Sequence, residues 1–84
     1  MRVLLVEDHR KLAAAVSDGL RREGMAVDLA FDGADALTHA AVNDYDVIVL
    51  DRDLPLVHGD EVCRQLFSKG SESRVLMLTA ATTI

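Results

Sequence analysis

The sequence predicts an α/β protein built on an open parallel sheet. Short runs of aliphatic residues recur along the 84-residue chain, and stretches with helical periodicity separate them. The runs are continuous rather than alternating, which is typical of strands buried on both faces of a parallel sheet. Parallel strands need long crossover connections, which are nearly always right-handed. We therefore expect the element order β-α-β-α-β-α-β.

Three aliphatic runs define three of the expected strands. They are Val3–Val6, Val47–Leu50 and Val75–Leu78, and each ends abruptly in a polar residue. A weaker candidate, Met25–Ala30, alternates in polarity along its length. Alternation of this kind predicts a half-exposed strand at an edge of the sheet.

The segment between the first two strands predicts an amphipathic helix. Leu12, Val16 and Leu20 recur every four residues, and charged residues occupy many of the other positions. These three residues would form the apolar face of the helix. Gly24 then offers a C-terminal stop. The basic pair just before it suits the negative end of the helix dipole.

Two further helices are expected later in the chain. The second would run from about Gly33 to Val42, with Asp32 as its N-cap. The third would begin near Gly59 and end before the glycine at position 70. Its inward side chains would be Val62, Cys63 and Leu66.

Composition excludes several classes of protein. Half of the residues are hydrophobic and the net charge is −5, so the chain is too apolar to be disordered. No apolar run approaches the ~18–20 residues that span a bilayer. Carboxylates follow the first aliphatic run too early for a secretory signal. The single cysteine, Cys63, fits a reducing compartment. We expect a cytoplasmic domain that does not itself bind nucleic acid phosphates.

Polar residues follow three of the expected strands directly. Glu7 and Asp8 follow the first, Asp51 the third, and Thr79 the fourth. Sites of open α/β folds gather where the carboxyl ends of strands meet. Carboxylates that converge there would repel one another, and Mg²⁺ would relieve the repulsion. A carboxylate beside Mg²⁺ can attack phosphorus to give an aspartyl phosphate, and the Thr79 hydroxyl could donate a hydrogen bond to a phosphoryl oxygen.

A purely structural interpretation of the same residues is also available. Glu7 and Asp8 could be favourable charges at the start of a helix, and Asp51 could cap a loop. The functional interpretation is favoured because each polar residue falls immediately after an aliphatic strand, at the same end of the expected sheet.

These motifs resemble the receiver domain of two-component response regulators. The resemblance covers the whole chain and rests on residues 3–8, 47–51, 54–55 with Gly59, and 76–80. It implies a flavodoxin-like (CheY-like) fold with strand order 2-1-3-4-5. It also implies a protein that is not an enzyme, phosphorylated by a sensor histidine kinase. The residues around Asp51 and the Glu7-Asp8 pair are most like those of regulators with a C-terminal winged-helix DNA-binding domain.

The resemblance also implies a role for each site residue. Asp51 would accept the phosphoryl group, Thr79 would be the switch hydroxyl, and Ala80 would keep space beside the acceptor. Asp8 would bind Mg²⁺ directly and Glu7 through a water. The full set of expected metal-binding residues is Glu7, Asp8, Asp51 and Asp53, the last through its backbone carbonyl.

The chain departs from the family's pattern in two ways. Arg52 and Asp53 stand where apolar residues are more common. Arg52 could be a solvated charge or could contact a phosphate, and we favour the solvated charge. The domain 1–84 is expected to be a receiver truncated after its fourth strand, without the fourth helix, fifth strand and fifth helix. Because the phosphate-pairing lysine belongs to those elements, poor phosphorylation is expected, and DNA contact would need an output domain absent here. The uncovered fourth strand predicts a homodimer or larger assembly.

One alternative comes from another class of protein. Phosphatases of the haloacid dehalogenase type also carry Asp-x-Asp after an aliphatic strand. In that case Asp51 would be the nucleophile, Asp53 the general acid, and Thr79 the hydroxyl of a second motif. The acidic pair Glu7-Asp8, one strand earlier, argues against this alternative.

Overall fold

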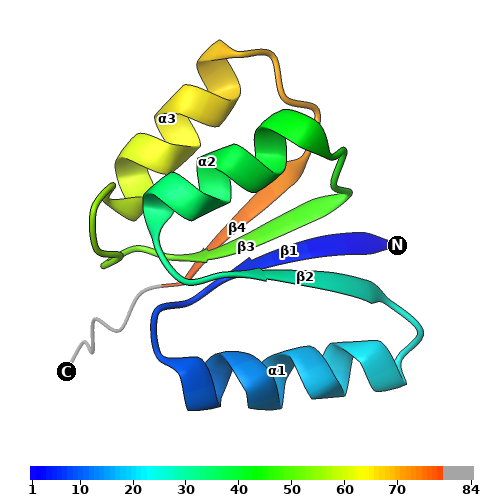
Figure 1. Cartoon of the computed structure of the whole chain (residues 1–84). Helices are drawn as coiled ribbons and strands as arrows, with labels where there is room; N and C mark the ends of the chain where they lie inside the picture. Colours follow the sequence, from blue (N-terminus) through cyan, green and yellow to red (C-terminus); the bar gives the residue numbers. More distant parts are fainter. Residues whose placement is uncertain (79–84) are drawn as a thin grey trace, which may run out of the picture.

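The structure, a computed structural model, describes residues 1–78, so the predictions for Thr79 and Ala80 lie outside the described residues. Its elements follow the predicted order (Figure 1). They are β1 (Arg2–Val6), α1 (Arg10–Arg22), β2 (Ala26–Ala30), α2 (Gly33–Val42), β3 (Val47–Asp51), α3 (Gly59–Ser68) and β4 (Arg74–Leu78). No helix in this part of the chain is long and apolar enough to cross a membrane.

The four strands form one parallel sheet in the order β2-β1-β3-β4. Helix α1 lies on one face, and α2 and α3 lie side by side on the other (Figure 1). The chain passes from β1 outward to β2 and then returns to the other side of β1 as β3. The β1–β3 boundary is therefore the point where the strand order reverses, and the carboxyl ends of both strands meet there.

Both faces of β1 are buried, as its continuous aliphatic run predicts, whereas β3 is buried on one face and half-buried on the other. In β1, Leu4 and Val6 face α2 and α3, whereas Val3 and Leu5 belong to a separate cluster on the α1 side. The larger cluster joins the sheet to both helices of its layer. Its buried members are Leu4, Val6, Ala30, Ala36, Tyr45, Ile48, Leu50, Leu54, Val62 and Leu66.

The predicted apolar face of α1 is wrong. Leu12 and Val16 are 49% and 39% exposed, whereas Ala13 and Ser17 are fully buried. Small side chains let the helix backbone approach the sheet closely, so the Ala13–Ser17 line faces inward and the larger residues lie beside it. The Ser17 hydroxyl satisfies its hydrogen bond within the helix, by donating to the Ala14 carbonyl at 3.0 Å.

The outer strands also agree with the sequence. β2 lies at one edge with partial exposure, as its alternation predicts. β4 lies at the other edge in the described chain, and Leu76 and Leu78 are 55% and 51% exposed on the face away from α3. The expected inward position of Cys63 on α3 is only partly met, since this residue is half-buried.

Candidate functional site

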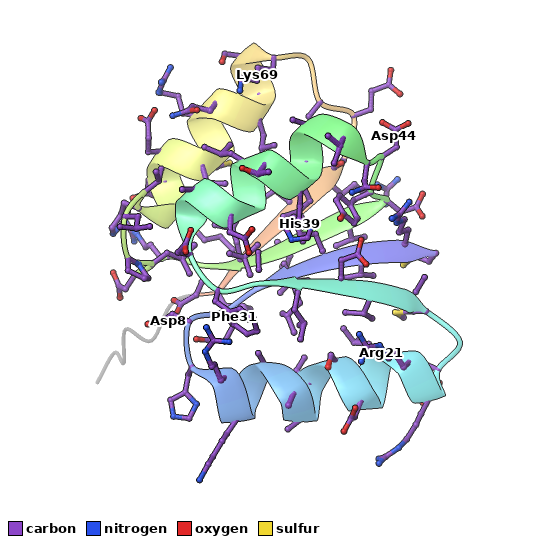
Figure 2. All side chains as sticks on the ribbon, viewed as in Figure 1. Asp8, Arg21, Phe31, His39, Asp44 and Lys69 are labelled. Carbon is purple, nitrogen blue, oxygen red and sulfur yellow. The ribbon has the colours of Figure 1, made fainter. Side chains whose placement is uncertain are left out.

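The acidic residues predicted to converge do so. Glu7, Asp8 and Asp51 each offer a carboxylate oxygen, and these oxygens all lie within 4.8 Å of one another. β1 and β3 are neighbours with Val6 opposite Leu50, so Glu7, the residue after β1, lies beside Asp51, the last residue of β3. Figure 2 shows Asp8 at this carboxyl edge, beside Phe31 from the end of β2. The cluster therefore occupies the switch point of the sheet.

The turn from β1 to α1 fixes Glu7 and Asp8 outside the helix. The Glu7 backbone N–H donates to the Ala30 carbonyl at 3.0 Å, which extends the strand pairing by one residue. The Glu7 carboxylate accepts the His9 N–H at 2.9 Å, and His9 in turn caps α1 by accepting the Leu12 N–H on its ring. Since α1 has no acidic residue in its first turn, the acidic pair does not serve as helix-start charges.

The surroundings of Glu7 shift the pKa of its carboxyl group. Burial raises the pKa of the Glu7 carboxyl above its usual value, and a hydrogen bond with Asp8 and repulsion from Asp51 act in the same direction. The backbone N–H of His9 acts in the opposite direction. A site that penalises its own negative charge favours a bound cation, because the cation removes the repulsion.

Asp53 lies close to the cluster but turns its side chain elsewhere. Its backbone N–H donates to the Asp51 carboxylate at 3.2 Å. Its own carboxylate lies 3.4 Å from the ring of His58. The Asp53 side chain is thus separate from the three-carboxylate group, which is compatible with a contribution through the backbone carbonyl.

The carboxyl end of β3 is closely packed against the start of α3. The Gly59 N–H donates to the Arg52 carbonyl at 2.9 Å. A Cβ at position 59 would lie 2.6 Å from the Asp51 carbonyl oxygen and 2.8 Å from the Arg52 Cα. Glycine is therefore required here for close approach, and it sets the position of the loop that follows Asp51.

Two side-chain pairs at this edge were not predicted from the sequence. The Arg52 guanidinium pairs with Asp60 on α3, Nε to Oδ2 at 3.2 Å. The Arg10 guanidinium lies over the Phe31 ring, 4.0 Å from its centre. In each pair the two residues lie on different segments of the chain, and only the fold brings them together. In the sequence, only the unusual charge at position 52 hinted at either pair.

The fold and the acidic edge define a flavodoxin-like α/β domain with a carboxylate site at its switch point. This chain belongs to the response regulator receiver domain family, whose sequence profile matches residues 3–84. The prediction of a response regulator receiver domain is confirmed.

Named relatives support the same family. The chain is 67% identical over 81 residues to the transcriptional regulatory protein CutR of Streptomyces coelicolor, covering 96% of this chain and 37% of that protein. It is 40% identical over 84 residues to the response regulator MprA of Mycobacterium avium, covering 100% of this chain and 37% of that protein. The chain thus spans little more than a third of the length of these relatives.

Solved structures agree on the fold. The receiver domain of the Francisella response regulator 1452 has a TM-score of 0.92 at 30% identity, covering 98% of this chain and 68% of that one. Response regulator TrrA of Thermotoga maritima, solved in complex with Mg²⁺-BeF, has a TM-score of 0.90 at 30% identity, covering 96% and 70%. These neighbours are response regulators and not haloacid dehalogenase-type phosphatases, so the phosphatase alternative is not supported.

Proposed function

We propose that this chain is a phosphoacceptor in which Asp51 receives a phosphoryl group from a sensor histidine kinase in the presence of Mg²⁺. The observation that carries the proposal is the meeting of the Glu7, Asp8 and Asp51 carboxylates within 4.8 Å at the switch point. Relatives named as transcriptional regulators support a role in the control of transcription, which we place in the cytoplasm.

The residues present fit a magnesium ion. Carboxylate oxygens are the ligands that Mg²⁺ prefers, and a dication would offset the repulsion among the three carboxylates that meet here. Asp8 and Asp51 would bind the ion directly, Glu7 through a water, and Asp53 through its backbone carbonyl. The ion would neutralise charge on the phosphoryl oxygens during transfer.

The chemistry required of the protein is a displacement at phosphorus. A carboxylate oxygen of Asp51 attacks the phosphorus of the phosphohistidine, the P–N bond breaks, and the histidine nitrogen leaves with its electron pair. A carboxylate nucleophile needs no general base, because its attacking oxygen has no proton to lose. We assign Thr79 as the hydroxyl that contacts a phosphoryl oxygen and Ala80 as the small residue beside it.

Acetyl phosphate labelling tests the proposal without a kinase. Intact mass spectrometry of the chain with Mg²⁺ should detect the addition of one phosphoryl group to the wild type and to Asp53→Asn. Asp51→Asn should remain unlabelled. Asp53→Asn is the matched control because its carboxylate lies outside the cluster. Labelling of Asp51→Asn, or repeated turnover of a phosphate ester, would contradict the proposal.

We further propose that residues 1–84 form the first part of a receiver domain, since they cover 68% of the Francisella receiver. An output domain outside these residues would contact DNA. Phosphorylation of the isolated 84 residues would be slow, because the phosphate-pairing lysine that the resemblance implies lies outside them and neither Lys11, on α1, nor Lys69, after α3, follows a strand. A chain labelled as fast as a longer receiver would contradict this.

The isolated 84-residue chain should also self-associate. Leu76 and Leu78 expose apolar surface beside the free edge of β4, and an uncovered edge strand pairs readily with another copy. Sedimentation should show a dimer or larger species at high micromolar concentration. A stable monomer, or self-association unchanged by Leu76→Lys, would contradict this proposal.

A further inference from the structure

We propose that Arg52 is a phosphoryl-binding side chain of this site and that Asp60 holds it aside until a phosphoryl group arrives. The inference rests on the proposed function, because it assumes that Asp51 is the acceptor. It assigns to Arg52 a direct contact in place of the solvated charge expected from the sequence.

The site needs a cation beyond magnesium. Three carboxylates meet within 4.8 Å, and a dication leaves that group with net negative charge. Every phosphodonor is itself an anion, and charge spreads over the phosphoryl oxygens during transfer. A positioned guanidinium would offset this charge, and its planar fork suits phosphate oxygens.

Arg52 is the basic residue best placed to do this among the described residues. It follows Asp51 directly in the chain. Arg10, the other arginine at this edge, lies over the Phe31 ring, whereas Lys69 ends α3 at its far end (Figure 2). We infer that the long Arg52 side chain, released from Asp60, reaches a phosphoryl group on the preceding residue.

The backbone of Arg52 is held while its side chain is free to move. Its N–H donates to the Leu78 carbonyl and its carbonyl accepts the Gly59 N–H, both at 2.9 Å. Its side chain is 52% exposed and makes one ion pair, to Asp60. A fixed backbone and a solvated side chain allow the guanidinium to turn without moving the strand.

Asp60 is a partner that can be exchanged. Its carboxylate is 54% exposed, and exposed ion pairs are weak. Asp60 lies in the first turn of α3, where the positive end of the helix dipole stabilises a carboxylate without any other cation. His58 also lies 3.6 Å from it. A doubly charged phosphoryl group binds arginine more strongly than one solvated carboxylate does, so the exchange is favoured.

Substitutions of Arg52 and of Asp60 should change the labelling rate in opposite directions. If Arg52 binds the phosphoryl group, Arg52→Gln should slow the initial rate of labelling by acetyl phosphate about tenfold, the effect of one lost charged hydrogen bond. Asp60→Asn should raise the rate about two- to threefold, because it frees the guanidinium. Arg52→Lys should recover part of the loss. If the pair only joins α3 to β3, both substitutions break the same bond and should change the rate in the same direction.

A second exposed arginine, on α3, provides the control. Arg64→Gln removes a comparable exposed arginine, paired with Glu61 on α3, and should leave the rate unchanged. Circular dichroism melting checks that each variant folds. Equal rates for Arg52→Gln and wild type, or changes in the same direction for Arg52→Gln and Asp60→Asn, would overturn this inference while Asp51→Asn stays unlabelled. Labelling of Asp51→Asn at the wild-type rate would instead overturn the proposed function.

Discussion

Replacing Gly59 by alanine tests how tightly β3, the strand that ends in Asp51, is packed against α3. A Cβ at position 59 would lie 2.6 Å from the Asp51 carbonyl oxygen, whereas ordinary contacts begin at 3.4 Å, so the helix start must move by 3.4 − 2.6 = 0.8 Å. Overpacking against rigid backbone costs about 1–3 kcal/mol. Alanine recovers up to about 1 kcal/mol through its better helix propensity. The expected result is a net destabilisation of about 1–2 kcal/mol.

A matched substitution on α1 gives the opposite sign. Gly19 is exposed within the helix, and a Cβ there would meet nothing within 4 Å. Gly19→Ala should stabilise the protein by about 0.5–1 kcal/mol. Thermal melts followed by circular dichroism at one protein concentration separate the two, since 1 kcal/mol shifts Tm by about 4–8 °C in a domain of this size. A Gly59→Ala variant as stable as Gly19→Ala would refute the close packing described at the site.

The other predictions concern charge. Asp8→Asn should stabilise the metal-free protein by about 0.5 kcal/mol in urea titrations and lower the pKa of Glu7, measurable by NMR, since it removes one repelling carboxylate. Saturating Mg²⁺ at about 100 times its Kd should stabilise the wild type by about 2.7 kcal/mol but Asp51→Asn much less; equal stabilisation would place the ion elsewhere. Tyr45→Phe should cost about 1 kcal/mol, because the buried hydroxyl donates to Asp28 at 2.6 Å. That bond holds the pKa of Asp28 below its usual 3.8, so its contribution is present above pH 3.8 and lost as pH falls through the folded pKa. Tyr45→Phe should therefore flatten the acid limb of a stability–pH profile, and an unchanged limb would contradict this.

Local signals in the sequence were sufficient for most of the fold. Asp32 was recognisable as a cap, and α2 runs over the predicted residues with the Asp32 carboxylate accepting the Asp35 N–H at 2.7 Å. The aliphatic runs predicted strands whose bounds differ from the observed ones by one residue at most. Caps and strand runs act over a few residues, so their physical chemistry is visible without the folded structure.

The face of α1 could not be predicted from periodicity alone. Hydrophobic spacing selected Leu12 and Val16, but the helix packs through Ala13 and Ser17 because small side chains allow the closest approach to the sheet. Burial of a serine is permitted only because its hydroxyl finds a carbonyl within its own helix. This arrangement depends on the distance between layers, which the local sequence does not specify.

At the site, too, some features were predictable from the sequence and others depended on packing. The convergence of Glu7, Asp8 and Asp51 was predictable, because parallel strands place their carboxyl ends at one edge. The Arg52–Asp60 pair was not, since its two residues lie on different elements and their meeting depends on the close approach at Gly59. Likewise Asp28 lies on β2 and Tyr45 just before β3, two strands on opposite sides of β1 in the sheet, and only their packing brings them into contact.

Mapping the position of the phosphoryl group tests the central claim most directly. The chain is labelled with acetyl phosphate and Mg²⁺, reduced with borohydride, digested, and sequenced by tandem mass spectrometry. Borohydride converts an aspartyl phosphate to homoserine, so the modified residue keeps a distinct mass. We expect homoserine at position 51 and unmodified aspartate at positions 8 and 53. Homoserine at either of those positions, or modification that does not depend on Mg²⁺, would contradict it.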